Sequence, residues 1–411
     1  MTSNTRVVVI GAGLAGVTLA RRLGELGTPA LLVGDEEHRP YNRVLLAEVL
    51  AGRYSPEVIA LPAPGLLRGR VTGVDRAGRT VRCADGSVIA YDTLVMATGS
   101  NAVLPPLRGL FTADRQLPEG VHAFRTMDDC LGLSKAVRPG VRAVVIGGGL
   151  LGVSAARALA VRGAQVVLAQ QSERLMERQL DPAASALVRR HLEDLGVEVH
   201  TECRVRDVRS VGGAVRSVEM ADGYALGADL VVLACGVRPR VGLAQAAGLE
   251  VAKGVVVDDE LRTSDPHIRA VGDCAQHAGR VYGLAAPALE QAGALAELLA
   301  AGDTAARYTG TRSLTRLTLT GPGSPFGPDS PFDLAAFGET DPRPGDDVVQ
   351  LADATRGTYR KVVVRDDRLV GGVLVGELGT VGALARAWEG AEPLPSDGGP
   401  LLHLLTNDGG S

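Results

Sequence analysis

The sequence predicts an α/β protein with two similar halves and a smaller third region. Two short apolar runs, Arg6 to Ile10 and Ala143 to Ile146, each lead into a glycine-rich turn and then into a helical stretch. Both halves continue with a hairpin pattern, over 71–83 in the first half and over 205–211 and 214–220 around Gly212 and Gly213 in the second. In each half an apolar strand follows that ends on glycine, at Gly99 and at Gly236. This duplicated order predicts two Rossmann-like dinucleotide-binding domains more firmly than either glycine motif alone.

Composition narrows the classes of protein. The 411 residues suit two or three domains, and the net charge of −4 argues against nucleic acid as a partner. The five cysteines are widely spaced without a CxxC pair, so we expect no metal site and no redox dithiol. The chain leads straight into its first strand and has no apolar run of about 20 residues. We therefore expect a cytoplasmic protein that does not cross a membrane.

The first half places an acidic pair after its second strand. The turn is Gly11-Ala12-Gly13-Leu14-Ala15-Gly16, followed by a predicted helix from Val17 to Leu26. An apolar run, Ala30 to Val33, then leads to Asp35 and Glu36. Glycine turns of this kind bring backbone N–H groups to a pyrophosphate, and an acid at this spacing can accept hydrogen bonds from ribose hydroxyls.

The second half lacks this acid. Its turn, Gly147 to Gly152, and its predicted helix, Val153 to Val161, repeat the first pattern. The second strand ends instead at Gln170 and Gln171, with Arg174 close enough to meet a phosphate. A neutral amide neither requires a ribose hydroxyl nor repels a 2′-phosphate, so the choice between NADH and NADPH stays open.

The rest of the chain adds a further loop and a third region. Val271-Gly272-Asp273 precedes a helical stretch from Pro287 to Ala300. Residues 312–388 alternate in β fashion at 314–319, 348–351, 359–364 and 369–375 and end in a helical stretch at 381–388. This pattern predicts a small α+β domain around the single tryptophan, Trp388. Residues 391–411 are rich in Gly, Pro, Asp and Ser and read as a flexible tail.

Together these motifs resemble the FAD-dependent pyridine-nucleotide oxidoreductases. The resemblance covers residues 1 to about 307, and three longer strings, at 41–46, 175–181 and 282–287, sharpen it. They are similar to the flavin-binding part of the assimilatory NAD(P)H nitrite reductase large subunit and to nitrate reductase electron-transfer subunits. The resemblance implies a three-layer, glutathione-reductase-like fold, with FAD as cofactor and NADH or NADPH as electron donor.

The resemblance also implies domains and cofactor contacts. We expect an FAD domain from 1–110 and 241–310, an NAD(P)H domain from 111–240, a C-terminal domain from 311–390 and the tail. The residues expected at FAD are Gly11, Gly13, Leu14, Ala15, Gly16, Asp35, Glu36, Arg43, Ala97, Thr98, Gly99, Gly272, Asp273 and Pro287. Those expected in the nucleotide half are Gly147, Gly149, Leu150, Leu151, Gly152, Ser154, Gln170, Arg174 and Gly236.

Three functions follow from the resemblance. The first is a reductase that passes electrons from NAD(P)H through FAD to a separate metal-containing acceptor, a nitrate or nitrite reductase. The second serves a ferredoxin or a rubredoxin. The third is a flavin-binding redox sensor with impaired nicotinamide turnover, suggested by Ser154 where the family has a glutamate that reaches the nicotinamide. No side chain is assigned as catalytic, and a homodimer is left open.

Several residues near these motifs also have a plainer interpretation. Cys235 and Cys274 are interpreted as packing residues rather than redox groups, and Trp388 as a core anchor. His277 is interpreted as a loop residue. Glu290 is assigned either to the flavin edge or to a solvated helix face.

Overall fold

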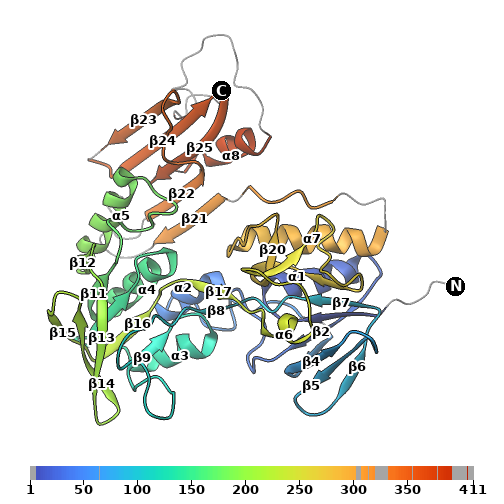
Figure 1. Cartoon of the computed structure of the whole chain (residues 1–411). Helices are drawn as coiled ribbons and strands as arrows, with labels where there is room; N and C mark the ends of the chain where they lie inside the picture. The colour runs from blue at the N-terminus through green and yellow to red at the C-terminus, as the bar shows by residue number, and fades with distance from the viewer. Residues whose placement is uncertain are drawn as a thin grey trace. The chain divides into compact units, whose positions relative to one another are not determined.

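The computed structural model describes residues 6–63, 65–301, 307–312, 314–319, 332–353, 355–376, 378–390 and 405. They belong to two compact units, each with its own parallel sheet (Figure 1). The first unit comprises Met1–Leu46, Tyr54–Asn101 and Val237–Thr311. The second comprises Ala47–Arg53, Ala102–Gly236 and Arg312–Ser411.

A five-stranded parallel sheet forms the centre of the first unit. The strand order is β19-β7-β1-β2-β3, and all four residues of β1 are buried. Such a continuous apolar run is typical of a parallel strand that is covered on both faces. Helices α1 and α7 pack against each other beside this sheet (Figure 1). The bounds are β1 Val7–Ile10, β2 Ala30–Gly34, β3 Leu66–Arg68, β7 Thr93–Met96, β19 Ile268–Ala270, α1 Leu14–Glu25 and α7 Ala285–Ala301.

A small antiparallel sheet and several short elements complete the first unit. The predicted hairpin over 71–83 is confirmed as β4 and β5, joined by a third strand, β6. The bounds are β4 Val71–Asp75, β5 Thr80–Cys83, β6 Val88–Ala90, β8 Ser100–Ala102, β17 Val237–Pro239, β18 Val255–Val257, β20 Ala275–His277, α6 Gly242–Ala246, η1 Arg43–Leu45 and η2 Gly272–Cys274. Helix α2, Leu46–Leu50, belongs mainly to the second unit, which contains Ala47–Arg53.

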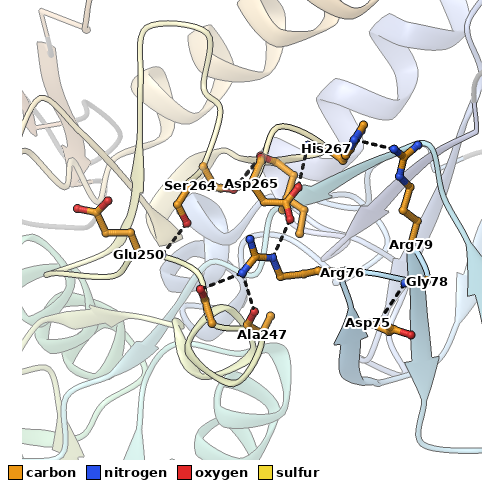
Figure 2. A network of polar contacts seen from close by, with 12 residues as sticks. Asp75, Arg76, Gly78, Arg79, Ala247, Glu250, Ser264, Asp265 and His267 are labelled. Atoms are coloured by element: carbon orange, nitrogen blue, oxygen red, sulfur yellow. Dashed lines mark hydrogen bonds and ion pairs between the residues drawn. The ribbon is translucent and has the colours of Figure 1, made fainter.

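Arg76 ties the turn after β4 to the segments around α6 and β19. Its Nε donates to Asp265 Oδ2 at 2.7 Å, and its NH1 donates to Gly248 O at 3.1 Å (Figure 2). Nearby, Arg79 NH2 lies 2.8 Å from His267 Nε2. Burial disfavours ionisation of Asp265, but the hydrogen bonds from Arg76 and from the His267 N–H outweigh it and lower the pKa of this carboxyl. The network therefore braces the chain that leads into β19.

The second unit repeats the parallel sheet. Its order is β12-β11-β10-β16-β9, and the predicted hairpin around Gly212 and Gly213 is confirmed as β13 and β14. The bounds are β9 Val121–Ala123, β10 Arg142–Ile146, β11 Gln165–Ala169, β12 Glu198–His200, β13 Val205–Val211, β14 Ala214–Met220, β15 Ala225–Gly227, β16 Leu230–Leu233, α3 Met127–Ala136, α4 Leu150–Val161 and α5 Pro182–Asp194.

The C-terminal part of the second unit is a five-stranded antiparallel sheet with one helix. The predicted α+β character is confirmed, although the prediction missed β22. Trp388 packs on Phe337 with ring centroids 5.3 Å apart, as expected of a core anchor. The expected tail lies outside the described residues, except that Leu405 is buried in this core. The bounds are β21 Leu314–Leu319, β22 Phe332–Gly338, β23 Asp347–Asp353, β24 Thr358–Arg365, β25 Arg368–Val375 and α8 Val381–Gly390.

Three predicted helices begin earlier in the structure than in the sequence analysis. Helix α1 starts at Leu14 rather than Val17, and α4 starts at Leu150 rather than Val153. The last residues of each glycine turn are therefore already helical, which brings the helix N-terminus up to the turn. Helix α7 starts at Ala285, two residues before Pro287. Within the described residues, none of the helices has the length and apolarity needed to cross a membrane.

Candidate cofactor sites

The first glycine turn holds the backbone of β1, α1 and the end of β7 in direct contact. A Cβ on Gly11 would lie 2.1 Å from Ala97 O, and one on Gly16 would lie 2.0 Å from Gly11 O. Neither position can accept a side chain. Gly11 also has a φ of 110°, which L side chains rarely adopt. Gly13 differs, because a Cβ there would meet nothing within 4 Å.

Gly13 is the N-cap of α1, and it leaves that helix end free to bind an anion. No side chain caps the helix, and its first turn, which includes Leu14 and Ala15, holds no acidic residue. Unsatisfied backbone N–H groups and the helix dipole make such an N-terminus a site for a phosphate. The open space beside Gly13 lies where such a group would enter.

The two candidate ribose acids of the first unit have different partners. Glu36 accepts a hydrogen bond from Tyr41 OH at 2.7 Å and pairs with the guanidinium of Arg43. Arg43 NH1 also donates to Tyr41 OH at 2.9 Å. Asp35 is more exposed and lies 3.8 Å from Arg240 NH1. Arg43 and Tyr41 thus orient Glu36, which makes Glu36 the better fixed of the two acids.

The segment after β7 turns sharply beside the same cradle. Gly99 has a φ of 71°, and Thr98 Oγ1 donates to Arg240 O at 2.8 Å. The Ala97 N–H donates to Ile10 O at 2.8 Å, which keeps this segment against β1. Thr98 is therefore anchored to the chain that re-enters this unit at Val237.

Asp273 lies on a short 3₁₀ turn that α7 holds in place. The Gly272 N–H donates to Gln291 Oε1 at 2.7 Å, and Asp273 Oδ2 accepts from Ser100 Oγ at 2.8 Å. A Cβ on Gly272 would lie 3.0 Å from the Ala15 Cβ, so this turn packs on the first turn of α1. The structure thereby brings the predicted Asp273 to the first glycine turn, through Gln291 and Ser100, which the sequence analysis had not selected.

Two further predictions in this unit are resolved by the structure. His277 is not a loop residue: it lies in β20, 3% exposed, with Nε2 2.9 Å from Asp259 Oδ1. The loop prediction was wrong because Ala275–His277 pairs in parallel with β18, which the sequence pattern did not reveal. Glu290 is exposed on α7, as a solvated helix face requires, and accepts a hydrogen bond from Thr311 Oγ1 at 2.6 Å. Pro287 is buried in the first turn of α7.

The second glycine turn repeats the first in detail. A Cβ on Gly147 would lie 2.5 Å from Ala234 O, and one on Gly152 would lie 1.7 Å from Gly147 O. A Cβ on Gly149 would meet nothing within 4 Å. Gly149 is the N-cap of α4, which has no capping side chain and no acid in its first turn. Gly236, which follows β16, has a φ of 94°, as Gly99 has its positive φ after β7.

Ser154 is directed into its own helix. Its Oγ donates to Leu150 O at 2.8 Å, one turn earlier in α4, and the residue is 8% exposed. Leu151, next to Leu150, is also in this first turn. Back-bonding of this kind satisfies the hydroxyl locally. In this conformation the Ser154 side chain does not extend out of the helix, as the longer glutamate expected at this position in the family would.

Gln170 is also used inside the protein. Its Oε1 accepts from the Gly148 N–H at 2.7 Å, and its Nε2 donates to Arg174 O at 3.4 Å. The amide therefore supports the glycine turn and is not free to bind ribose hydroxyls, as the sequence had allowed. Arg174 NH2 lies 3.5 Å from Asp341 Oδ2.

The cysteines behave as packing residues. Cys274 Sγ lies 3.3 Å from the carbonyl oxygens of Met96 and Val271, and burial raises the pKa of its thiol. Burial also raises the pKa of Cys235 to about 11. Thiols with raised pKa values are poor nucleophiles. Among the residues described, no three His, Cys, Asp or Glu side chains gather as metal ligands would.

Comparison with known proteins shows the family. The family described as pyridine nucleotide-disulphide oxidoreductase matches residues 5–292, and a rubredoxin NAD+ reductase C-terminal domain matches residues 330–389. The chain belongs to the pyridine nucleotide-disulphide oxidoreductase family. It is therefore an oxidoreductase whose cofactors are FAD and a nicotinamide nucleotide. The two cradles fit such dinucleotides, because in each of them the middle glycine, Gly13 or Gly149, leaves open space at a helix N-terminus that no side chain caps.

Individual relatives agree with this placement. The chain is 34% identical over 386 residues to the assimilatory nitrate reductase electron transfer subunit of Bacillus subtilis strain 168, covering 90% of this chain and 48% of the relative. It is 35% identical to the nitrite reductase [NAD(P)H] large subunit of Klebsiella oxytoca, covering 88% of this chain and 37% of the relative. The chain thus spans half or less of these two relatives. The resemblance drawn from the sequence motifs is confirmed.

A solved structure matches nearly the whole chain. The covalent putidaredoxin reductase–putidaredoxin complex aligns with a TM-score of 0.84 at 26% identity, covering 98% of this chain and 99% of that one. The predicted fold class, with two dinucleotide-binding domains and a C-terminal α+β domain, is confirmed.

Proposed function

We propose that the protein carries electrons from NAD(P)H through FAD to a separate metal-containing acceptor, an assimilatory nitrate or nitrite reductase. The observation that carries this proposal is the match to the nitrate reductase electron transfer subunit over 90% of the chain. The two glycine cradles support it, since a flavin reductase of this kind needs one site for each dinucleotide.

In this proposal the first unit holds FAD. Gly11, Gly13 and Gly16 form the pyrophosphate cradle with the N-terminal residues of α1. Glu36, oriented by Tyr41 and Arg43, binds the adenosine ribose, and Asp35 lies beside it. Asp273 would lie beside the ribityl and pyrophosphate portion and accept hydrogen bonds from the ribityl hydroxyls. The remaining contacts come from Leu14, Ala15, Arg43, Ala97, Thr98, Gly99, Gly272 and Pro287.

The second unit holds the nicotinamide nucleotide. Gly147, Gly149, Leu150, Leu151 and Gly152 form its pyrophosphate cradle, and Gly236 allows the turn after β16. Gln170 and Ser154 act indirectly, because both side chains bond to the backbone of the turn or of α4. The proposed domains remain 1–110 with 241–310 for FAD, 111–240 for NAD(P)H and 311–390 for the C-terminal domain.

In this proposal the residues of this chain bind and orient the two dinucleotides, and none of them is assigned as catalytic. When bound, FAD supplies the two-electron acceptance and the one-electron release that the reaction needs. The N-terminus of α7, at Ala285 and Pro287, stabilises negative charge at the flavin through the helix dipole. Gln291 and Ser100 hold the turn of Asp273, which keeps the ribityl chain in one position.

Anaerobic electron transfer tests the function. FAD-loaded protein is reduced with NADH or NADPH and then mixed with an oxidised nitrate or nitrite reductase catalytic subunit, a rubredoxin or a [2Fe-2S] ferredoxin. The proposal expects fast reoxidation by the nitrate or nitrite reductase. Bound FAD that is reduced by dithionite but by neither nucleotide would contradict it and would favour the redox sensor.

A second acceptor class has its own support. The match of residues 330–389 to a rubredoxin NAD+ reductase C-terminal domain favours a rubredoxin or a ferredoxin as the alternative acceptor. Faster reoxidation by one of these proteins in the same assay would select that alternative. We further propose a cytoplasmic location, which the five free cysteines support.

A further inference from the structure

At the end of β11, the Gln170 amide is not free to bind a ribose hydroxyl. Gln170 uses its Oε1 on the Gly148 N–H at 2.7 Å and its Nε2 on Arg174 O at 3.4 Å. A carboxylate at this position would select a ribose that has a free 2′-hydroxyl and would repel a 2′-phosphate. In this chain Gln170 can do neither, so discrimination at the 2′ position has to come from other side chains.

Arg174 is the cation at this strand end, and it is incompletely paired. Its side chain is 26% exposed, and its NH2 lies 3.5 Å from Asp341 Oδ2. Its Nε is buried without a hydrogen-bond partner within the described part of the chain. A guanidinium held in this way retains donors that a phosphate could engage.

Asp341 comes from the C-terminal domain, in the connection between β22 and β23. Its side chain is 66% exposed. An ion pair with so exposed a partner is weak, and a group of higher charge can displace it. Asp341 therefore places a movable negative charge beside Arg174.

Buried contacts hold the C-terminal domain at this edge of the nucleotide half. Asp181, the N-cap of α5, accepts from Lys361 Nζ at 2.9 Å and from Tyr359 OH at 2.5 Å. His191 of α5 stacks on Phe332 of β22, with ring centroids 4.4 Å apart. These contacts fix the strand that leads towards Asp341 and so keep its carboxylate within reach of Arg174.

We propose that Arg174 binds the 2′-phosphate of NADPH and that Asp341, a carboxylate from the C-terminal domain, sets the balance between NADPH and NADH by competing for the same guanidinium. This inference rests on the proposed function and deepens it by assigning the residues that select the donor. It makes the C-terminal domain a determinant of nucleotide choice.

The physical basis is a competition between two anions. A phosphate monoester carries nearly two negative charges at neutral pH and three acceptor oxygens, whereas Asp341 carries one charge and remains mostly in water. The phosphate can therefore displace Asp341. Its binding is weakened both by the loss of that pair and by repulsion from the displaced carboxylate. NADH has no group that contends with Asp341, so its affinity depends little on that residue.

Binding of nucleotide fragments to the oxidised, FAD-loaded protein tests the proposal without turnover. Isothermal titration calorimetry compares adenosine 2′,5′-bisphosphate, which has the 2′-phosphate, with 5′-AMP, which lacks it. Asp341→Asn should tighten binding of the bisphosphate about fivefold, and Arg174→Gln should weaken it about tenfold, the size of one charge-assisted contact. Binding of 5′-AMP should change less than about twofold in both variants.

A matched control removes the same charge elsewhere on the same domain. Asp367 is exposed in the turn between β24 and β25, and Asn tolerates its positive φ of 54°. Asp367→Asn should leave both affinities unchanged. When Asp341→Asn is added to Arg174→Gln, the affinity for the bisphosphate should not change further, because Asp341 acts only by competing for the Arg174 guanidinium.

Three results would overturn the proposal. They are an unchanged bisphosphate affinity in Asp341→Asn, an equal loss of both ligands in Arg174→Gln, and equal effects of Asp341→Asn and Asp367→Asn. Failure of the proposed function is separate, since it would appear as bound FAD that neither nucleotide reduces even though the fragments bind.

Discussion

Replacing Gly16 with alanine should abolish tight FAD binding. The added Cβ would lie 2.0 Å from Gly11 O, well inside the 3.0 Å that real Cβ atoms keep. Gly11 has no room to move away, because its Cα already packs against the backbone of Ala97. A Cβ built on Gly11 would lie 2.1 Å from Ala97 O. Helix α1 must therefore move by about 1 Å, at the upper end of the ~1–3 kcal/mol that overpacking costs.

A cost of about 3 kcal/mol corresponds to a loss of FAD affinity of about 150-fold. The assay is fluorescence titration of apoprotein with FAD, with circular dichroism to confirm that the sheets are intact. Gly24→Ala is the matched control, because it adds the same methyl to the same helix where nothing lies within 4 Å. That control should bind FAD normally and gain up to ~1 kcal/mol of stability from helix propensity. Wild-type FAD affinity in Gly16→Ala would refute the reasoning.

Three further predictions concern buried polar groups. Arg157 is 0% exposed and pairs with Glu48. Arg157→Met should lower the free energy of unfolding by about 3–5 kcal/mol, because it leaves the Glu48 carboxylate without this partner. Adding Glu48→Gln should recover part of this loss in urea melts. Burial lowers the pKa of His191 from the ordinary value near 6.5 to about 4. The unfolded chain therefore binds a proton at His191 at a higher pH than the folded protein does. The stability that His191 contributes is full above pH about 6.5 and should fall by up to ~3 kcal/mol towards pH 4. Thermal melts should show that His191→Leu flattens this dependence; an unchanged slope would contradict it. Gln291→Leu leaves the Gly272 N–H unsatisfied and should weaken FAD binding about tenfold, measured by titration, while a smaller change than twofold would exclude this role.

Much of the backbone could be predicted from the sequence because its signals are local. The hairpin over β13 and β14 was predicted with the bounds found, since alternating residues flank Gly212 and Gly213. Helix α5 was not predicted, although its start was readable. Asp181 caps it and Pro182 stands at its first position, a common helix-start pair.

Strand β22 was missed for a physical reason. Its residues, Phe332–Gly338, are buried at Leu334, Ala335, Ala336 and Phe337 in succession, so no alternation marks them as a strand. The strand exists because β21 and β25 pair with it on either side, which is information held elsewhere in the chain.

The candidate sites show the same division. The first and last glycines of each turn follow from sequence because backbone contact excludes a side chain at Gly11, Gly16, Gly147 and Gly152. The partners that orient the sites do not follow from sequence, because they depend on contacts between distant segments. Gln291 reaches Gly272 from 19 residues away, and Ser100 reaches Asp273 from 173 residues away. Gln170 has a residue type that suits ribose, yet the structure directs it to Gly148.

The central claim is that one glycine cradle holds FAD and the other delivers electrons to it from NAD(P)H. Rapid anaerobic mixing of NADH or NADPH with FAD-loaded Gly152→Ala tests it most directly, because the new Cβ would lie 1.7 Å from Gly147 O. The control is Gly132→Ala, whose Cβ would make an ordinary contact 3.5 Å from the His122 ring. The account predicts that Gly152→Ala keeps its FAD and is reduced by dithionite but loses reduction by nucleotide, while the control behaves as wild type. Wild-type rates of reduction by nucleotide in Gly152→Ala would contradict the account.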